Sequence, residues 1–214
     1  MASILGKEFF DIDYFHGAKK NAYFDYERMN ASKMFSGQLA FIKDHHITGK
    51  IIDVGCALGL FLRELNSDTN ELYGCDISEY AIQKARDNVP NAKFQVVDLE
   101  DFVPYPDDYF DCITALDVIE HTSDYEKVWE TLVKKIKHGG FLIISMPTLT
   151  WVRKVMGFMD KDISHVSILK KEQIYKLIQK YQLDIVEENH YCLFPFVYRI
   201  PFPPVVLELL LQKH

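Results

Sequence analysis

The sequence predicts an α/β fold: a Rossmann-like, doubly wound sheet of mostly parallel strands with helices on both faces. Short apolar segments typical of buried strands alternate with segments of helical spacing from residue 50 to about residue 187, which is the pattern of parallel strands joined by crossover helices. A glycine-containing turn at residues 55–59 joins the first strand to its helix. The chain of 214 residues is 48% hydrophobic and 26% charged, as expected of one domain with a buried core.

The first predicted strand–turn–helix unit covers residues 51–65. Its strand is a short apolar run rich in β-branched residues, as a strand covered on both faces requires. Its helix is indicated by apolar residues at helical spacing. These residues are Ile51, Ile52 and Val54 in the strand and Leu58, Phe61, Leu62 and Leu65 in the helix. One more helix ahead of this unit is predicted by Ala31, Phe35, Leu39 and Ile42.

The rest of the core continues this alternation. A helix is expected to begin after Ser78, a suitable N-cap, and to stop at Pro90. Residues 123–126 have the form of a capping box and predict a helix that ends at two consecutive glycines. Further strands are predicted over residues 71–76, 94–99, 110–116, 141–146 and 183–186, and a last helix over residues 171–181.

Acidic residues and glycines stand near the ends of these predicted strands. Because the carboxyl ends of parallel strands gather at one edge of the sheet, where ligands of such folds bind, we expect their side chains to converge. Glycines in the turn allow a ligand to lie against the main chain, and the following helix presents unpaired N–H groups to an anion. The converging residues are Asp53, Gly55, Asp76, Asp98 and Leu116.

Four segments of the chain carry a resemblance to a known family. Residues 55–59 read Gly-Cys-Ala-Leu-Gly and therefore lack the dinucleotide fingerprint G-x-G-x-x-G. Residues 53–59 instead resemble motif I of class I S-adenosylmethionine (SAM) methyltransferases, with Ala57 in place of the middle one of three alternating glycines. The strands that end on acidic residues, and residues 110–121 with their terminal Glu-His pair, resemble the next motifs of that family in order.

The resemblance implies that SAM binds at the strand ends and leaves as S-adenosylhomocysteine. Its amino-acid part is expected on the glycine turn, its ribose on Asp76 and its adenine beside Asp98 and Leu99. An aromatic segment at residues 9–26 is expected to act as a lid through Tyr14 or Tyr23, or else as a hydrophobic latch packed across the domain. The complete cofactor-binding set is Asp53, Gly55, Cys56, Ala57, Gly59, Asp76, Ile77, Asp98, Leu99, Leu116, Tyr14 and Tyr23.

Methyl transfer from a sulfonium can rely mainly on positioning and exclusion of water. A hydroxyl or ammonium acceptor must still lose a proton, and histidine is a suitable base near neutral pH. The candidates are His121, for which a structural role is the competing interpretation, and His165. His165 lies in a predicted irregular loop, residues 148–169, whose Asp-x-x-His-Val sequence resembles some small-molecule methyltransferases and is expected to cover the acceptor. No metal site is predicted, because Glu120 and His121 alone are not a ligand set.

The predicted function is transfer of a methyl group from SAM to an unidentified small molecule, at oxygen, nitrogen or carbon. The alternatives are a non-catalytic SAM-binding protein that acts through protein partners and a nicotinamide dehydrogenase. The net charge of -7 and pI of about 5.6 argue against a nucleic-acid surface. No apolar run is long enough for a membrane span, and the four cysteines contain no C-x-x-C pair, so a cytoplasmic protein with reduced thiols is expected.

One domain is predicted, with an N-terminal extension (1–48), a cofactor-binding core (50–147), the acceptor loop and a C-terminal part (170–214). The family normally completes its sheet with a seventh strand, but four prolines between residues 195 and 204 predict an atypical or incomplete one. The apolar residues 205–211 would then form an exposed patch. We expect this patch to be a homodimer contact or a wall for an apolar substrate. The alternatives are a cover over the acceptor pocket and the cut end of a longer protein.

Overall fold

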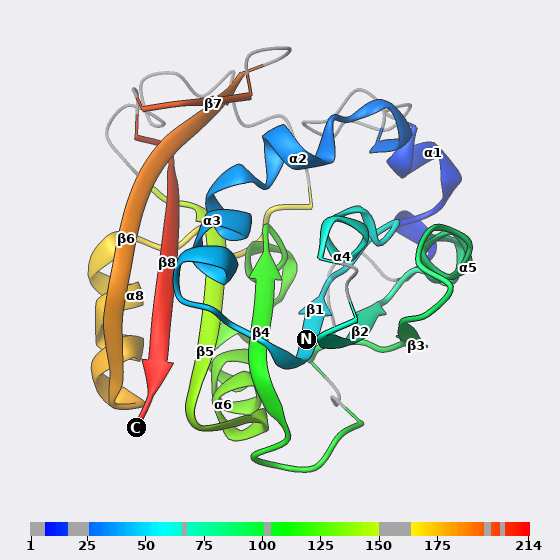
Figure 1. Cartoon of the computed structure of the whole chain (residues 1–214). Coiled ribbons are helices and arrows are strands. Elements are labelled where there is room, and N and C mark those ends of the chain that lie inside the picture. Colours follow the sequence, from blue (N-terminus) through cyan, green and yellow to red (C-terminus); the bar gives the residue numbers. More distant parts are fainter. Residues whose placement is uncertain are drawn as a thin grey trace.

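The computed structural model describes residues 7–16, 26–65, 68–100, 104–149, 164–194, 198–201 and 204–214. Within these residues the strands form one sheet in the order β3-β2-β1-β4-β5-β8-β6-β7 (Figure 1). The neighbours from β3 to β5 pair in parallel, whereas β8 runs antiparallel to β5 and to β6. The strands are β1 Gly49–Val54, β2 Asn70–Asp76, β3 Lys93–Val96, β4 Phe110–Leu116, β5 Ile136–Pro147, β6 Leu183–Phe194, β7 Tyr198–Ile200 and β8 Val206–Lys213.

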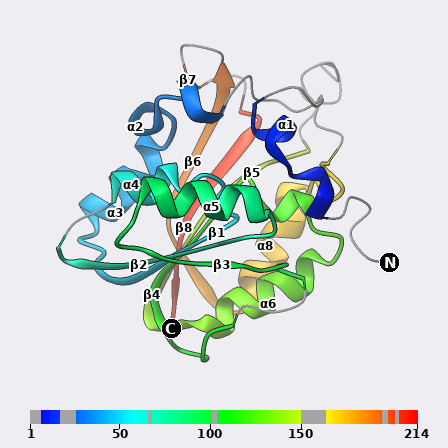
Figure 2. The ribbon, with the colours of Figure 1, turned by 90° about the vertical axis from the view of Figure 1, so that its right-hand side faces the viewer.

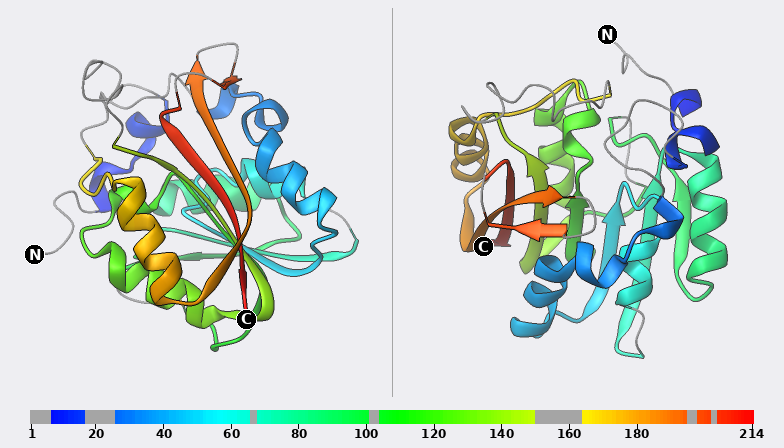
Figure 3. Two further views of the ribbon diagram at one scale, coloured as in Figure 1. Left: turned by 90° about the vertical axis from the view of Figure 1, so that its left-hand side faces the viewer. Right: turned by 90° about the horizontal axis from the view of Figure 1, so that it is seen from above.

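Helices cover both faces of the sheet, which confirms the predicted α/β fold. Helices α3, α4 and α5 pack on one face and α6 and α8 on the other (Figures 2 and 3). No described helix has the length and apolar character needed to cross a bilayer. The helices are α1 Ile12–Phe15, α2 Ala31–Met34, α3 Ser36–Asp44, α4 Leu60–Glu64, α5 Glu79–Asn88, α6 Tyr125–Lys135 and α8 Lys171–Lys180, with 3-10 turns η1 Lys7–Phe9, η2 Tyr26–Arg28 and η3 Ile119–His121.

The two cores follow from the alternation of side chains along each strand. Ile51 and Ile52 are adjacent in β1, yet Ile51 packs in the cluster that contains Phe61 of α4, and Ile52 packs in the cluster that contains Trp129 of α6. All these side chains are buried. The four cysteines are likewise buried thiols without a disulfide, as the sequence predicts.

Local signals decide where several helices begin. Ser78 caps α5, and its side chain accepts a hydrogen bond from the backbone N–H of Ala81, as predicted. For α6 the predicted cap is wrong by one residue, because the Asp124 side chain accepts the Lys127 N–H at 3.1 Å. The Ser123 hydroxyl instead donates to the Glu100 carboxylate at 2.8 Å and is therefore engaged outside the helix.

The single helix predicted between Ala31 and Ile42 is divided in two. Helix α2 begins at the N-cap Asn30, whose side chain accepts the Lys33 N–H at 3.1 Å, and ends after one turn. Phe35 takes φ −95° and ψ 18°, outside the regular helical values, and α3 starts immediately after it. The break allows Phe35 to pack its ring against Phe61 of α4, 5.4 Å between ring centroids.

The expectation of an incomplete seventh strand and an exposed tail is wrong. The prolines precede the last strand, β8, which inserts between β5 and β6 and pairs with both of them along its length. Leu207, Leu209, Leu210 and Leu211 are at most 1% exposed because helices cover both faces of this strand. The tail therefore offers no apolar patch for a dimer contact or a membrane surface. Strand β6 is also longer than the four residues predicted, because β8 gives it a partner.

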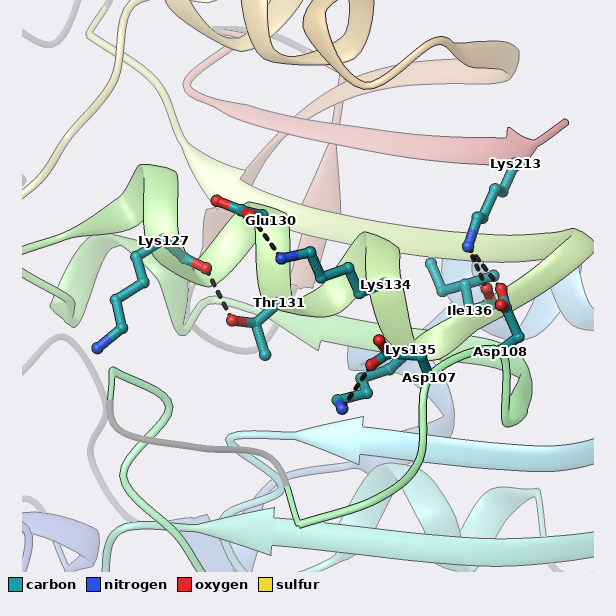
Figure 4. Close-up of polar contacts among 9 residues, drawn as sticks. All are labelled: Asp107, Asp108, Lys127, Glu130, Thr131, Lys134, Lys135, Ile136 and Lys213. Carbon is teal, nitrogen blue, oxygen red and sulfur yellow. Dashed lines mark hydrogen bonds and ion pairs between the residues drawn. The ribbon is translucent and has the colours of Figure 1, made fainter.

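The end of β8 is fixed at the edge of the sheet opposite the strand-end loops. The Lys213 ammonium donates to Asp108 Oδ1 at 2.8 Å and to the carbonyl oxygen of Ile136 at 2.7 Å (Figure 4). Beside it, Lys135 pairs with Asp107 at 2.7 Å. Ion pairs at such a surface contribute little each, so these contacts fix the position of the chain end while the buried leucines of β8 supply the stabilisation.

Candidate active site

A cavity of about 1090 Å³, its open mouth included, lies at the carboxyl ends of β1, β2 and β4. The order of strands reverses between β1 and β4, and in doubly wound sheets ligands bind at this switch point. Most predicted cofactor residues line the cavity, although they are distributed over more than 100 residues of sequence. Those that line it are Tyr14, Asp53, Gly55, Cys56, Ala57, Asp76, Ile77, Asp98, Leu99 and Leu116, together with the predicted catalytic residue His121.

Three predicted site residues are not placed in this lining. Tyr23 lies outside the described residues. Gly59 begins α4 in a left-handed conformation (φ +72°), and a Cβ added there would come within 3.1 Å of the Ala85 Cβ, so this glycine serves the packing of α4 against α5. His165 packs on His121, with 4.9 Å between ring centroids, but does not itself line the cavity.

The turn after β1 has the backbone that its glycine pattern suggests. Gly55 has φ +73°, and a Cβ there would lie 2.4 Å from the Cγ2 of Val118, so no larger residue fits without displacing the turn after β4. Ala57 also takes a positive φ of 47°, a conformation that costs a non-glycine residue about 1 kcal/mol. The resemblance therefore holds in three dimensions, because Ala57 adopts the backbone conformation that a glycine would take without strain.

Asp76 links the turn to the end of β2. Its Oδ2 accepts the Ala57 N–H and its Oδ1 accepts the Ser78 N–H, both at 2.9 Å. A carboxylate can accept about four hydrogen bonds, so both oxygens retain capacity toward the cavity. Burial raises the pKa of Asp76 more than its backbone donors lower it.

Asp53, at the end of β1, is a second buried carboxyl group in the cavity wall. Its Oδ1 accepts a hydrogen bond from the Thr114 hydroxyl at 2.6 Å. Burial raises the pKa of Asp53 to about 7, against the lowering effect of that hydrogen bond and with a smaller contribution from the charge of Asp76. The protonation state of this group therefore changes close to neutral pH.

We predict that SAM affinity rises with pH through this range. The raised pKa of Asp53 means that the folded protein holds a proton that the unfolded chain releases near pH 4, so this group stabilises the fold at low pH and loses that contribution as pH passes about 7. A cationic ligand favours the ionised carboxylate and hence releases the proton. Calorimetric titration from pH 5.5 to 8.5 should give a dissociation constant that falls by up to about tenfold per pH unit below 7.

The variant Asp53→Asn is the control for this pH dependence. It cannot titrate, but it retains Asp76 and the ligand's own ionisable groups, so only the part of the slope that belongs to Asp53 disappears. Equal slopes in the variant and the wild type would contradict the prediction. Proton release, measured in buffers of different ionisation enthalpy, should fall in the variant as well.

The N-terminal segment forms an apolar wall of the cavity. Tyr14 is 3% exposed and packs its ring against Phe10, 5.0 Å between centroids. The Ser78 hydroxyl at the start of α5 donates to the carbonyl oxygen of Phe10 and ties this segment to the core. The described part of the aromatic segment thus packs on the domain and lines the cavity at the same time. Tyr26, Met29, Met34 and Phe35 continue the same wall.

The predicted catalytic histidines lie beside each other. His121 Nδ1 is 2.8 Å from the Ser164 hydroxyl, and its ring packs edge-on against Phe10 at 5.8 Å. Among the described residues, one ligand atom each of Glu120, His121 and His165 lie within 4.8 Å of one another, a grouping that sequence analysis did not predict. Glu120 is fully buried, so a carboxylate and two imidazoles meet where His121 lines the cavity.

Asp117 lines the cavity directly after β4 but is not among the site residues that the sequence predicted. Its position one residue beyond the predicted strand end was the available signal, since the ends of β1 and β2 also carry acidic residues. The apolar wall from Met29, Met34 and Phe35 was missed too, because nothing local distinguishes these residues from an ordinary core helix.

Comparison with known proteins identifies the fold and the chemistry. Residues 52–144 match the methyltransferase domain family. The chain is 22% identical over 169 residues to the ubiquinone biosynthesis O-methyltransferase of Idiomarina loihiensis, covering 71% of this chain and 70% of that protein. It is 27% identical over 100 residues to the enzyme of that name in Thiobacillus denitrificans, covering 45% of this chain and 43% of that protein. The demethylmenaquinone methyltransferase of Anoxybacillus flavithermus is 28% identical over 146 residues, 61% and 62% of the two chains.

Solved structures of other proteins have the same fold. A protein of Pyrococcus horikoshii superposes with a TM-score of 0.71 at 17% identity, over 98% of this chain and 100% of that one. The magnesium protoporphyrin IX methyltransferase of Synechocystis, solved with bound S-adenosylhomocysteine, gives 0.67 at 19% identity, over 86% and 83% of the two chains. The nicotinamide and non-catalytic alternatives are therefore set aside: with their glycine turn at the switch point of a doubly wound sheet, residues 52–144 form a SAM-dependent methyltransferase domain of class I.

Proposed function

We propose that this enzyme methylates a hydroxyl oxygen of an apolar aromatic small molecule, of the phenol or quinol class. The observation that carries the proposal is the uneven character of the cavity. Its carboxylate-bearing end suits the polar cofactor, whereas Tyr26, Met29, Met34 and Phe35 form an apolar wall. Aromatic rings and methionine side chains bind flat apolar molecules through burial and polarisable contacts. Similarity to O-methyltransferases of ubiquinone biosynthesis supports the same acceptor class.

We place the cofactor by the residues that line the cavity. Asp76 would accept the ribose hydroxyls, because it lines the cavity and each of its oxygens can accept a further hydrogen bond while it holds the turn. Asp98 and Leu99 would flank the adenine, and the turn around Gly55 would hold the amino-acid part, with Asp53 near its ammonium group. SAM supplies a methyl group on a positively charged sulfur, and the residues of this chain orient the acceptor and exclude water.

Of the histidines, we propose that His121 contacts the acceptor and that His165 supports it from behind. His121 lines the cavity, and His165 packs against its ring. The hydrogen bond between His121 Nδ1 and Ser164 fixes the orientation of the imidazole. A fixed polar group beside an apolar wall would select molecules that carry a polar substituent at one edge of the ring.

The test is methyl transfer from SAM labelled at its methyl group to chosen probes. Tert-butylcatechol and naphthohydroquinone should both become labelled, and hydrolysis-stable ether products should be identified by mass spectrometry. Their fully O-methylated forms serve as controls and should remain unlabelled. Labelling on a ring carbon would contradict the oxygen assignment, and absence of labelling in every hydroxyl probe, with SAM binding intact, would contradict the proposed acceptor class.

A further inference from the structure

We propose that Asp117 is the general base that removes the proton from the acceptor hydroxyl, and that Ser145 and Tyr191 position and tune it. This proposal rests on the proposed function, because it requires a hydroxyl acceptor. It assigns a catalytic residue outside the glycine turn, the ribose carboxylate and the histidines. The geometry that supports it connects the cavity to strand β6 through a series of hydrogen-bonded side chains.

Asp117 stands where the cavity meets the end of β4. It is the first residue beyond that strand and lines the cavity. Its backbone has φ 51°, in the left-handed region, and its N–H donates to the carbonyl oxygen of Ser145 at 2.8 Å. Strained conformations of this kind are retained where the surrounding structure fixes them and are common at functional sites. The hydrogen bond to Ser145 holds Asp117 in this conformation at the carboxyl end of β4.

A directed chain of hydroxyl groups ends on the Asp117 carboxylate. The Ser145 hydroxyl donates to Asp117 Oδ1 at 3.2 Å and lies 2.9 Å from the Tyr191 hydroxyl. Because Ser145 has a single hydroxyl proton, which it gives to Asp117, Tyr191 must donate to Ser145. The order is therefore Tyr191, then Ser145, then Asp117, and each bond polarises the next toward the carboxylate.

Strands β5, β6 and β8 hold these three side chains in place. Strand β8 lies between β6, which carries Tyr191, and β5, which carries Ser145 (Figure 1). The Ser145 side chain is buried, and the hydroxyl groups of the two residues lie 2.9 Å apart. The Arg199 guanidinium stacks 3.8 Å from the centre of the Tyr191 ring and forms two hydrogen bonds, 2.8 and 2.6 Å, to the buried carboxylate of Glu208. The Arg199–Glu208 ion pair thus packs on one face of the Tyr191 ring, whose hydroxyl lies 2.9 Å from that of Ser145.

The charged groups around Tyr191, Ser145 and Asp117 are compatible with a base at the cavity end of this series. Arg199 and Glu208 form an ion pair behind Tyr191, and Asp117 is the carboxylate at the cavity end of this series of hydrogen bonds. Burial raises the pKa of Tyr191, and the charges of Asp117 and Glu208 raise it further, so the phenol remains a donor at every working pH. The other carboxyl and imidazole groups that line the same cavity are Asp53, Asp76, Asp98, Glu100 and His121, and Arg199 lies behind Tyr191.

The reaction step balances as a substitution at carbon. The acceptor oxygen forms a bond to the methyl carbon while the bond from that carbon to sulfur breaks and its electron pair stays on sulfur. The acceptor proton moves to Asp117 and later to solvent. The products are the methyl ether, neutral S-adenosylhomocysteine and one proton. Asp117 needs no oxidant, reductant or further reactant for this role.

The experiment compares Asp117→Asn, Tyr191→Phe and the matched control Tyr181→Phe, with tert-butylcatechol as acceptor. Tyr181 is suited as the control because its hydroxyl is exposed, 3.4 Å from the carbonyl oxygen of Glu126, and does not line the cavity. Asp117→Asn should lower kcat by about a hundredfold to ten-thousandfold and leave SAM affinity, measured by calorimetry, within about twofold. Tyr181→Phe should match the wild type in both respects.

Tyr191→Phe provides the readout that a merely structural role would not give. Loss of its hydrogen bond to Ser145 weakens the bond that Ser145 makes to the carboxylate, so the acidic limb of the pH profile of kcat should move to higher pH, with kcat lowered about two- to tenfold. An unshifted limb would overturn the positioning role. Turnover of Asp117→Asn within threefold of the wild type would overturn the base assignment and leave the proposed function intact. A wild type that methylates no hydroxyl probe would overturn both.

Discussion

Replacing Glu208 by glutamine is expected to lower the free energy of unfolding by about 3 to 5 kcal/mol, because it leaves a buried guanidinium without its counter-charge. The Glu208 side chain is 0% exposed and that of Arg199 15% exposed. The pair joins β7 to β8, and Arg199 also donates to Gln38 of α3 at 3.2 Å. Gly37 leaves room for the Arg199 guanidinium, since a Cβ at position 37 would lie 2.4 Å from Arg199 Nη2. Urea denaturation of the variant and the wild type measures the difference.

Two further variants identify the cause of this loss. The double variant Arg199→Met with Glu208→Leu should recover most of the stability, since well-packed apolar residues can replace a buried ion pair at little cost. Glu130→Gln breaks an exposed pair with Lys134 and should change the free energy of unfolding by less than about 1 kcal/mol. A Glu208→Gln protein as stable as this surface control would show that β8 does not depend on the pair.

Replacing Asp76 by alanine is expected to weaken SAM binding by about 1.5 to 3 kcal/mol, roughly ten- to over a hundredfold. The variant removes the proposed acceptor of both ribose hydroxyls. It also removes the partner of two backbone N–H groups, those of Ala57 and Ser78, which hold the turn around the cavity. Calorimetric titration with SAM and with S-adenosylhomocysteine measures the loss, which should be similar for the two ligands because they share the ribose.

The structural part of this effect can be separated from the binding part. Thermal unfolding without ligand reports the loss of the two backbone hydrogen bonds, whereas ligand affinity reports both losses. Asp87→Ala removes the same charge from an exposed position on α5 and should leave affinity unchanged. If Asp76→Ala and Asp87→Ala bind SAM equally well, the ribose assignment is wrong.

The sequence by itself determined the cofactor half of this protein. The parallel strands, the glycine turn and the acids at strand ends are local patterns, since period, turn chemistry and capping act over a few residues. Once the strands are parallel, their ends meet, and so Asp53, Asp76 and Asp98 line one cavity although nothing but strand order relates them. Motif resemblance then supplied the chemistry. The position of Ser78 as a cap followed from the same local rules.

Only the tertiary structure decided the C-terminal half. Residues 205–211 have the composition of an exposed patch or of a central strand, and the choice depends on whether β5 and β6 leave a gap between them, which is a long-range property. The chain of Tyr191, Ser145 and Asp117 depends on the same choice, because β8 sets the distance across which Tyr191 reaches. A strand is buried by its neighbours in the sheet, and its own sequence cannot specify which neighbours those will be.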